Sequence, residues 1–410
     1  APANVPNTPE EAMESKTLME RARDLQPRLT QIRREIHQNP EIGFQEIATT
    51  ERIRRELTGL GVEILPLKLR TGLVGLLRGE RSGPGPVTAL RADTDALPVT
   101  ERTGLPYASR NEGVMHACGH DGNTTMLLGA AQLLSENRQR FSGAVKFLFQ
   151  PAEEIFGGAE AMIDAGCLRE PTVDRIVALH GWPDIEVGKV GVQAGPHMAS
   201  ADRFEIRVRG AGGHGAYPHL ARDPVTAAAH VVTALQAVIS RETSPMDRAV
   251  LSVCTLEAGT AFNVIPDEVV LGGTARCENE SVRAAIREKV DRVVRGTAGA
   301  MGCEGETAWT GLVPSLVNDE AACREIAGAA EDVLGPGAVE APGLTMGSED
   351  FALFLEQVPR GALVRIGLKE PGREAMRLHN DRFDFNDEAL PVGAALLARL
   401  VLRTHGLSGK

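Results

Sequence analysis

The sequence predicts an α/β fold with a mostly parallel sheet, into which a smaller α+β domain is inserted. Two observations lead to this prediction. Short apolar runs alternate with helical patterns at both ends of the chain, and the middle follows the order β-α-β-β-α-β. Alternating strands and helices favour a parallel sheet covered on both faces. A self-contained unit between two such stretches indicates a first domain that is discontinuous in sequence.

Helices open the first domain, and buried strands follow them. One helical pattern extends from Pro9 to Gln38 and ends before the Asn39-Pro40 breaker; a second covers Glu46–Leu60 and stops at Gly61. A helix of small residues is expected at Gly122–Glu136. The apolar runs typical of buried strands are Leu73–Arg78, Pro86–Ala92, Ala144–Gln150 and Arg175–His180.

The middle of the chain has the element order of a ferredoxin-like unit. In chain order, its strands and helices are expected at Arg203–Arg209, Asp223–Ser240, Ala249–Glu257, Glu268–Cys277, Val282–Gly299 and Glu304–Thr310. After Gly311 the α/β pattern returns, with a helix at Asp319–Leu334, a strand at Ala362–Gly367 and a final helix at Asp387–Arg403. We therefore expect residues 199–310 to be inserted between two parts of one domain, 1–198 and 311–410.

Composition and charge exclude several classes of partner. The 410 residues include 44 Lys and Arg against 55 Asp and Glu, a formal net charge of −11. This acidic balance argues against nucleic acid, because Lys and Arg supply most of the affinity for phosphates. Val225–Ser240 and Ala389–Leu402 are the most apolar stretches, but polar residues and a proline interrupt them. We interpret them as buried helices and expect no membrane span.

The cysteines and the start of the chain bear on the compartment. Six cysteines are scattered over the sequence and do not have the density of a disulfide scaffold. We expect five of them to pack as small hydrophobic residues and Cys118 to have a chemical role. The chain begins Ala-Pro-Ala-Asn, without a charged-then-apolar leader. We expect a cytoplasmic protein, although cleavage of a secretory signal would leave a similar start.

Residues that can bind metal ions follow the predicted strands. In chain order they are Asp93, Asp95, Cys118, His120, Glu153, Glu154 and His180. The carboxyl ends of parallel strands meet at one edge of a sheet, where ligands collect, and Cys, His and carboxylate suit zinc and related metals. Taken alone, Glu153-Glu154 is a surface turn and His180 a core histidine. Their recurrence after several strands and loops favours a metal site, in which one glutamate binds metal and its neighbour acts as general base.

A series of motifs gives these residues a context. The motifs that include them are Leu90-Arg-Ala-Asp93-Thr-Asp95-Ala-Leu-Pro98, His116-Ala-Cys118-Gly-His120-Asp121, Phe149-Gln-Pro-Ala-Glu153-Glu154 and Ala178-Leu-His180-Gly-Trp182-Pro. The others are Arg34-Glu-Ile-His37-Gln-Asn-Pro-Glu41, Gly213-His214, Asn263-Val-Ile-Pro266, Gly273-Thr-Ala-Arg276, Gly347-Ser-Glu-Asp350-Phe351 and Leu378-His379-Asn380. From about Ile32 to Leu402 the chain thus resembles the metal-dependent aminoacylase and carboxypeptidase family. Within it, the chain resembles the branch of hippurate hydrolases, N-acyl-amino-acid amidohydrolases and auxin-conjugate hydrolases.

The resemblance implies roles for individual residues. One or two divalent metal ions, Zn or Mn and otherwise Co or Ni, would be held by Cys118, His120, Glu154, His180 and His379. Glu153 matches the general base, and Asp95 matches a carboxylate that supports the metal site. His214 matches a residue that stabilises the oxyanion, often in the other subunit of a dimer. Asn263 and Arg276 match positions that hold the substrate carboxylate or carbonyl.

The implied reaction is hydrolysis of the amide bond of a small N-acyl amino acid, giving a carboxylic acid and a free amino acid. The inserted domain would act as a lid and as the contact of a homodimer. A carboxypeptidase or dipeptidase on the same scaffold is the nearest alternative, and a non-catalytic metal- or ligand-binding protein is a second. The glycine-rich stretch at 210–215 does not favour a nucleotide site, because Tyr217-Pro218 intervenes before the next helix.

One position departs from the family pattern. Many members have histidine where this chain has Asn123, in Gly119-His120-Asp121-Gly122-Asn123-Thr124. The missing imidazole is not among the implied ligands, so we expect metal binding to survive. The sequence leaves open how the replacement of histidine by Asn123 affects metal preference or the acyl pocket.

Overall fold

The computed structural model describes residues 9–406, and side-chain burial from residue 16 within that range. The chain forms two compact units. The first contains residues up to Gly195, residues 318–343 and those from Leu353 on; the second contains Pro196–Val317 and Leu344–Ala352. The sequence-based division at 199–310 differs from these units at both ends and does not include 344–352. The Ala-Pro-Ala-Asn start lies outside the described residues.

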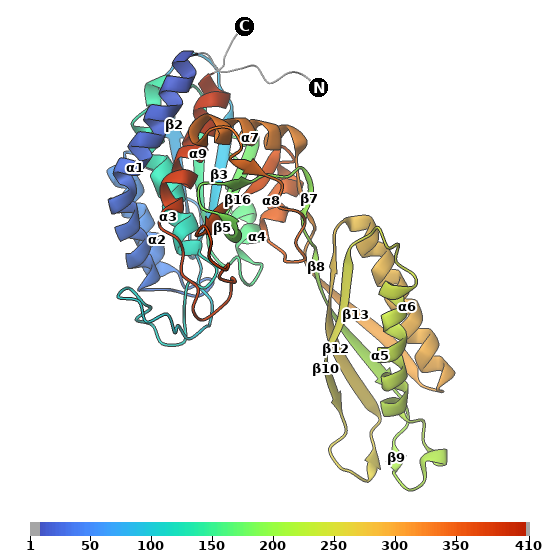
Figure 1. The fold of residues 1–410 in the computed structure, drawn as a ribbon. Coiled ribbons are helices and arrows are strands. Elements are labelled where there is room, and N and C mark those ends of the chain that lie inside the picture. The colour runs from blue at the N-terminus through green and yellow to red at the C-terminus, as the bar shows by residue number, and fades with distance from the viewer. Residues whose placement is uncertain (1–8, 407–410) are drawn as a thin grey trace. The chain divides into compact units, whose positions relative to one another are not determined.

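The first unit is built on an eight-stranded sheet in the order β1-β2-β4-β3-β5-β16-β6-β15 (Figure 1). In that order the strands are Glu63–Ile64, Leu73–Arg78, Ala144–Gln150, Val87–Asp93, Arg175–Glu186, Gly361–Lys369, Val190–Gly191 and Val339–Glu340. The central strands β4, β3, β5 and β16 are parallel, whereas β2 and β6 pair with them antiparallel. All of β4 is buried, as a strand covered on both faces should be. The predicted α/β class with a mostly parallel sheet is confirmed.

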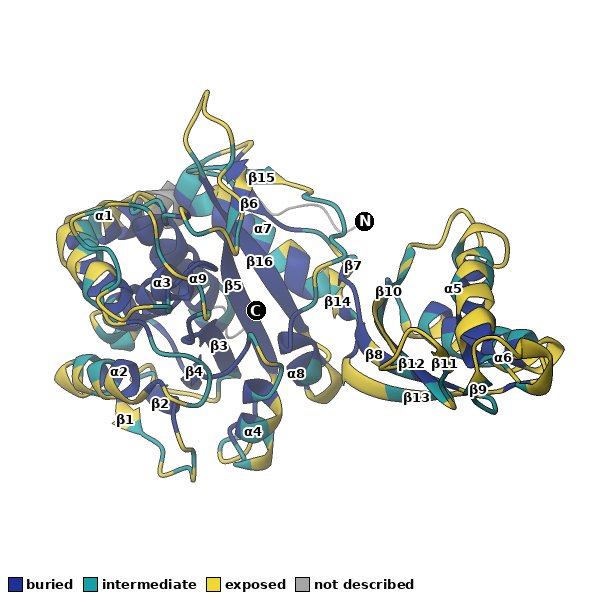
Figure 2. Cartoon of the chain, turned by 90° about the horizontal axis from the view of Figure 1, so that it is seen from below, coloured by how far each residue is buried: buried dark blue, intermediate teal, exposed yellow. Residues whose placement is uncertain are grey.

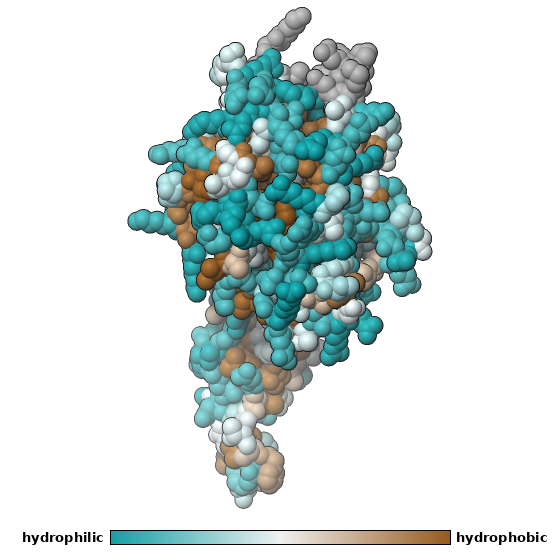
Figure 3. Space-filling model, turned by 90° about the vertical axis from the view of Figure 1, so that its left-hand side faces the viewer, coloured by the Kyte–Doolittle hydropathy of each residue, from teal (hydrophilic) through white to brown (hydrophobic). Residues whose placement is uncertain are grey.

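Helices cover this sheet. They are α1 (Pro9–His37), α2 (Ile47–Gly59), α3 (His120–Ser135), α4 (Gly158–Asp164), α7 (Glu320–Leu334), α8 (Phe351–Gln357) and α9 (Ala389–Gly406). Residues 389–402 of α9 are all buried, as expected, and Arg399 is accommodated there because it pairs with Asp332 at 2.8 Å. The outward face of α1 and α2 is largely hydrophilic (Figure 3). No helix in the described part of the chain is both long and apolar enough to cross a lipid bilayer.

The second unit is a four-stranded antiparallel sheet in the order β10-β12-β8-β13, with two helices. The elements are β8 (Ala201–Arg209), α5 (Pro224–Ser240), β10 (Ala249–Ala258), β12 (Glu268–Cys277), α6 (Glu280–Ala300) and β13 (Glu304–Val313). Phe204, Ile206 and Val208 alternate into its core. The predicted ferredoxin-like arrangement is confirmed. The expectation that Val225–Ser240 is a buried helix is wrong for one side of the helix: α5 packs on the sheet and on α6 and leaves its other side exposed (Figure 2), so Val225 is 40% exposed.

Other expectations need correction. His180 does not end its strand, because β5 continues to Glu186 by pairing with β16. Of the five cysteines expected to pack as hydrophobic residues, Cys254 is exposed. It lies at a register shift between Val253 and Thr255 of β10, where the extra residue of a bulge is left out of the pairing. The sequence analysis also missed α4, α8 and several very short strands, which have too few residues to show periodicity. Besides the two-residue strands β1, β6 and β15 of the large sheet, the missed strands are β7 (Gly195–Met198), β9 (Gly213–His214), β11 (Val264–Ile265) and β14 (Leu316–Asn318).

Candidate active site

The candidate residues of the first unit converge at the carboxyl ends of β3 and β4. Asp93 and Gln150 are partners in the parallel register of these strands, so the segments that follow them leave the sheet side by side. The helix α3 begins beside them, after Gly119, which has a left-handed backbone with φ 87°. A side chain at Gly119 would lie 3.1 Å from the ring of Phe385, so the backbone between Cys118 and His120 is closely packed.

The orientation of His120 is fixed by Asp95. Nδ1 of His120 lies 2.9 Å from the backbone oxygen of Asp95 and 3.2 Å from its Oδ1. Both are acceptors, so Nδ1 carries the proton and Nε2 presents a lone pair. Nε2 is buried and has no hydrogen-bond partner among the described residues. Oδ2 of Asp95 also accepts the backbone N–H of Glu154 at 3.0 Å. Asp95 therefore orients two candidate ligands at once.

Cys118 lies between two further histidines. Its sulfur is 3.5 Å from Nε2 of His180 and 3.3 Å from Nε2 of His379. Nδ1 of His180 lies 2.8 Å from the backbone oxygen of Gly181, so Nδ1 carries the proton and Nε2 points at the sulfur. Nε2 of His379 is also 3.3 Å from Oε1 of Glu154. His379 itself has a left-handed φ of 61°, held by its N–H, which donates to Ala117 at 2.8 Å.

The adjacent glutamates lie on a loop with an unusual backbone. Ala152 and Phe156, on either side of them, have positive φ values of 53° and 55°. The carboxylate of Glu46 accepts the N–H of Ala152 at 2.8 Å and so holds this conformation. Oε2 of Glu153 lies 3.9 Å from Nε2 of His120, and Oε1 of Glu154 lies at the same distance. Strained non-glycine backbone of this kind is concentrated at functional sites.

These residues fit divalent metal ions. The groups close enough to share an ion include Cys118–His120–His180, Cys118–Glu154–His379 and His120–Glu153–Glu154. Burial by itself lowers the pKa of His120, but Asp93, Asp95 and Glu154 raise it to about 10. The site thus stabilises positive charge, which a divalent cation supplies. Burial and the neighbouring Glu154 raise the pKa of the Cys118 thiol well above its usual value, and coordination to a metal would reverse this effect.

Asn123, the departure from the family pattern, is buried beside this cluster. Its Nδ2 donates to Oδ1 of Asp93 at 2.8 Å, and its Oδ1 accepts the N–H of Gly181 at 2.9 Å. The other carboxylate oxygen of Asp93 accepts from Arg91 at 2.7 Å. Asn123 therefore links Asp93 to Gly181, the residue after His180, beside the candidate ligands.

Three predicted site residues belong to the second unit. His214 is exposed, and its Nδ1 accepts the N–H of Ala216 at 3.0 Å, which leaves the proton of a neutral ring on Nε2. Asn263 is close by, because β11 pairs with β9 and the backbone oxygen of Asn263 accepts the N–H of Gly215 at 2.8 Å. Arg276 on β12 is half-buried and donates to the hydroxyl of Ser348 at 2.6 Å.

Sequence reasoning missed several residues that surround the ligands. Arg365, opposite His180 in the pairing of β16 with β5, places its guanidinium 4.0 Å from the centre of the Trp182 ring. That ring meets the His180 ring edge-on at 6.0 Å. Arg33 and His37 of α1 are buried among carboxylates near the start of α3. The motif at 34–41, which contains His37, was the signal for this second group, but no sequence pattern indicated the partners of these residues.

The fold and the ligand cluster are those of a metal-dependent hydrolase. Residues 89–403 match the sequence pattern of Peptidase family M20/M25/M40. The chain belongs to this family, and the resemblance inferred from the motifs is confirmed.

Relatives agree with this assignment. N-acetylcysteine deacetylase of Bacillus subtilis is 42% identical over 376 residues, covering 92% of this chain and 96% of its own. Hippurate hydrolase of Campylobacter jejuni is 38% identical over 381 residues, with 93% and 97% covered. Among solved structures, the Bacillus subtilis YXEP protein, described as a dinuclear metal binding peptidase of the M20 family, has a TM-score of 0.83 at 38% identity. That match covers 93% of this chain and 99% of the other.

Proposed function

We propose that the protein is a metal-dependent amidohydrolase that cleaves N-acyl amino acids into a carboxylic acid and a free amino acid. The observation that carries the proposal is the position of Glu153, 3.9 Å from the unpaired Nε2 of His120 and beside a cluster of Cys, His and Glu ligands. The names of the relatives, a deacetylase of N-acetylcysteine and a hydrolase of hippurate, support an N-acyl amino acid as substrate.

The ligands would be Cys118, His120, Glu154, His180 and His379. Metal ions held by these residues would polarise a carbonyl group and make a bound water more acidic. Glu153 would take a proton from the attacking water and return it to the leaving amine. The Cys and His ligands suit Zn, whereas the carboxylates also accept Mn, Co or Ni.

We also propose that the protein works in the cytoplasm. All six cysteines are free thiols, as is usual for proteins of that reducing compartment.

Residues of the second unit would recognise the substrate. His214 would donate from Nε2 to the oxyanion, because its Nδ1 is already occupied by the N–H of Ala216. Arg276 would hold the substrate carboxylate with its planar fork of donors, of which one nitrogen is already bound to Ser348. Asn263 would bind the same carboxylate or the carbonyl. The second unit would thus act as a lid over the ligand cluster.

The reaction class is tested with a panel of N-acetyl, N-benzoyl and indole-acetyl amino acids, together with unblocked dipeptides. We expect amine release from the blocked substrates, loss of release on chelation, and recovery when Zn or Mn is added back. An N-acyl amino acid amide, which lacks the carboxylate, serves as control and should be cleaved poorly if Arg276 reads that group. Cleavage of dipeptides in preference to blocked amino acids would indicate the peptidase alternative. Release that is insensitive to chelation would contradict the proposal.

We further propose that the second unit forms a homodimer with another copy of the chain. Among the described strands, β10 pairs only with β12, so one edge of a ten-residue strand is open. Leu256 at that edge is 54% exposed and Phe262 in the following loop is fully exposed. Long apolar strand edges are usually covered by another strand, and a twofold symmetric pairing would cover both copies at once.

The dimer is tested by sedimentation velocity. We expect the unchanged protein to sediment as a dimer, and the double variant Leu256→Lys/Phe262→Ser to shift to monomer because it places charge at the strand edge. Val317→Ser, which removes an exposed apolar side chain that lies outside β10 and its following loop, is the control and should remain dimeric. A monomeric unchanged protein at micromolar concentration would overturn this part of the proposal.

A further inference from the structure

Two segments that carry candidate metal ligands meet at one buried arginine. The first is the start of α3, where Asp121 follows His120. The second is the loop after His379, which contains Asp384 and Asp387. Both His120 and His379 share groups of candidate ligands with Cys118 and with Glu154, so the spacing of these two segments affects the geometry of the site.

Arg33 contacts both segments. Its side chain is completely buried, and its Nη1 lies 3.5 Å from Oδ2 of Asp121 and 3.2 Å from Oδ1 of Asp384. Its Nε donates to Oδ1 of Asp387 at 2.8 Å. One planar guanidinium therefore joins the helix that begins at His120 to the loop that begins at His379. The planar fork of arginine suits several carboxylates at fixed angles, which a lysine ammonium does not.

His37 and Tyr107 hold this arrangement in place. Nδ1 of His37 lies 2.8 Å from the Asp121 oxygen that Arg33 also contacts. The Tyr107 hydroxyl donates to Asp384 at 2.8 Å, and its ring centre is 4.7 Å from Arg33 Cζ. Arg33 and His37 thus share one oxygen of Asp121, while Arg33 and Tyr107 contact the two oxygens of Asp384.

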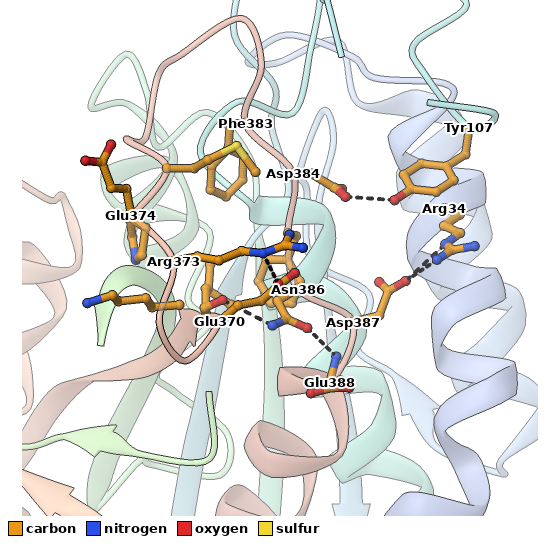
Figure 4. Close-up of a pocket in the computed structure, with 15 residues that line it drawn as sticks. Arg34, Tyr107, Glu370, Arg373, Glu374, Phe383, Asp384, Asn386, Asp387 and Glu388 are labelled. Carbon is orange, nitrogen blue, oxygen red and sulfur yellow. Dashed lines mark hydrogen bonds and ion pairs between the residues drawn. The ribbon is translucent and has the colours of Figure 1, made fainter. Parts of the chain in front are cut away.

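The loop is not fixed by close packing on its outer side. A cavity of about 380 Å³ lies between the loop and α1, lined in part by Arg34, Tyr107, Asp384 and Asp387 (Figure 4). Figure 4 shows Asp384 and Asp387 reaching across it to Tyr107 and Arg34. Phe383 and Phe385 pack the loop into the hydrophobic core on its inner side. On the side of the cavity, polar contacts to Tyr107, Arg33 and Arg34 hold Asp384 and Asp387.

We propose that Arg33 is a positioning residue of the metal site, which ties the His120 helix to the His379 loop and thereby sets the affinity for metal. It does so without being a ligand. The inference rests on the proposed ligand set. Partners that orient metal ligands in this indirect way typically change metal affinity by about 10–100-fold when they are removed.

Arg34 provides a matched control. It is the next residue of the same helix and binds Asp387 at 2.8 Å, but its side chain is 44% exposed. Within the described part of the chain it makes no hydrogen bond to Asp121. It therefore holds the loop from outside, without joining it to α3, and exposed pairs of this kind contribute little.

The test is titration of the metal-free protein with Co²⁺, whose visible absorption with a thiolate ligand reports both affinity and ligand geometry. We expect Arg33→Met to weaken Co²⁺ binding about 10–100-fold and to alter the absorption spectrum, whereas Arg34→Met stays within about twofold of the unchanged protein. Arg33→Lys, which keeps the charge but not the fork, should fall between them. An Arg33→Met protein that is folded by circular dichroism and binds Co²⁺ normally would overturn the proposal, as would full recovery with lysine.

If Arg33→Met does not fold, the double variant Asp384→Asn/Asp387→Asn tests the positioning role of Arg33 instead. It releases the loop while Arg33 and Asp121 remain, so we expect about tenfold weaker Co²⁺ binding; unchanged affinity and spectrum would overturn the proposal. Co²⁺ binding by the unchanged protein distinguishes the proposed ligand set from the positioning role of Arg33. Failure of that protein to bind Co²⁺ would contradict the ligand set, whereas binding that does not depend on Arg33 would contradict only the positioning role.

Discussion

Glu153→Gln is expected to lower kcat by about 10³-fold while leaving the metal content unchanged. The amide is nearly the same size as the carboxylate but cannot take a proton from water, and a general base contributes about 10²–10⁴-fold. A factor of 10³ corresponds to about 4 kcal/mol of transition-state free energy. The measurements are steady-state hydrolysis of the best substrate of the panel and metal analysis of the same preparation.

The metal content distinguishes the possible roles of Glu153. If the variant loses both turnover and metal, Glu153 is a ligand rather than the base. If it keeps both, the proposed mechanism is wrong. Glu160→Gln is the control, because Glu160 is exposed on α4 shortly after the same loop, and it should match the unchanged protein in both measurements.

Cys118→Ala is expected to remove at least half of the bound metal and to lower turnover by about 10³-fold or more. Cys118 belongs to the groups formed with both His120–His180 and Glu154–His379, so its loss affects every ion that those groups hold. Metal content after equilibration with excess Zn and removal of the free ion gives the stoichiometry. Amine release from the same samples gives the turnover.

A second cysteine serves as the control for this variant. Cys323 is buried in α7 of the same unit, so Cys323→Ala removes a similar side chain from the core without touching the cluster. We expect Cys323→Ala to lower thermal stability but to keep its metal. Full metal content and turnover in Cys118→Ala would show that the thiol is not a ligand and that the ions are held elsewhere.

Much of the fold was predictable because its elements have long, regular patterns. The residues of β4 are apolar almost throughout and buried throughout, and α9 is apolar around its whole circumference. The exposed side of α5 was not predictable in the same way. Its sequence is as apolar as a buried helix, but in the second unit α5 packs on the four-stranded sheet and on α6, and its other side stays exposed.

The candidate site also has a part that was predictable from the sequence and a part that was not. The types and order of Cys118, His120, Glu153, Glu154 and His379 indicated metal and general-base chemistry, because few other functions use those side chains together. The sequence did not show which nitrogen of each histidine is available. In the structure, Nδ1 of His120 donates to Asp95 and Nδ1 of His180 donates to the Gly181 carbonyl, which aims both Nε2 atoms into the cluster.

By itself, the sequence determined the fold class, the family and the residues with chemical potential, since these depend on composition, spacing and motif order. Only the tertiary structure decided how those residues are held. Arg33 lies 88 residues from Asp121 and 354 from Asp387 in sequence, and Asn123 reaches across to Asp93 and Gly181. Such contacts depend on the relative positions of helices, strands and loops after packing, and no local pattern in the chain encodes them.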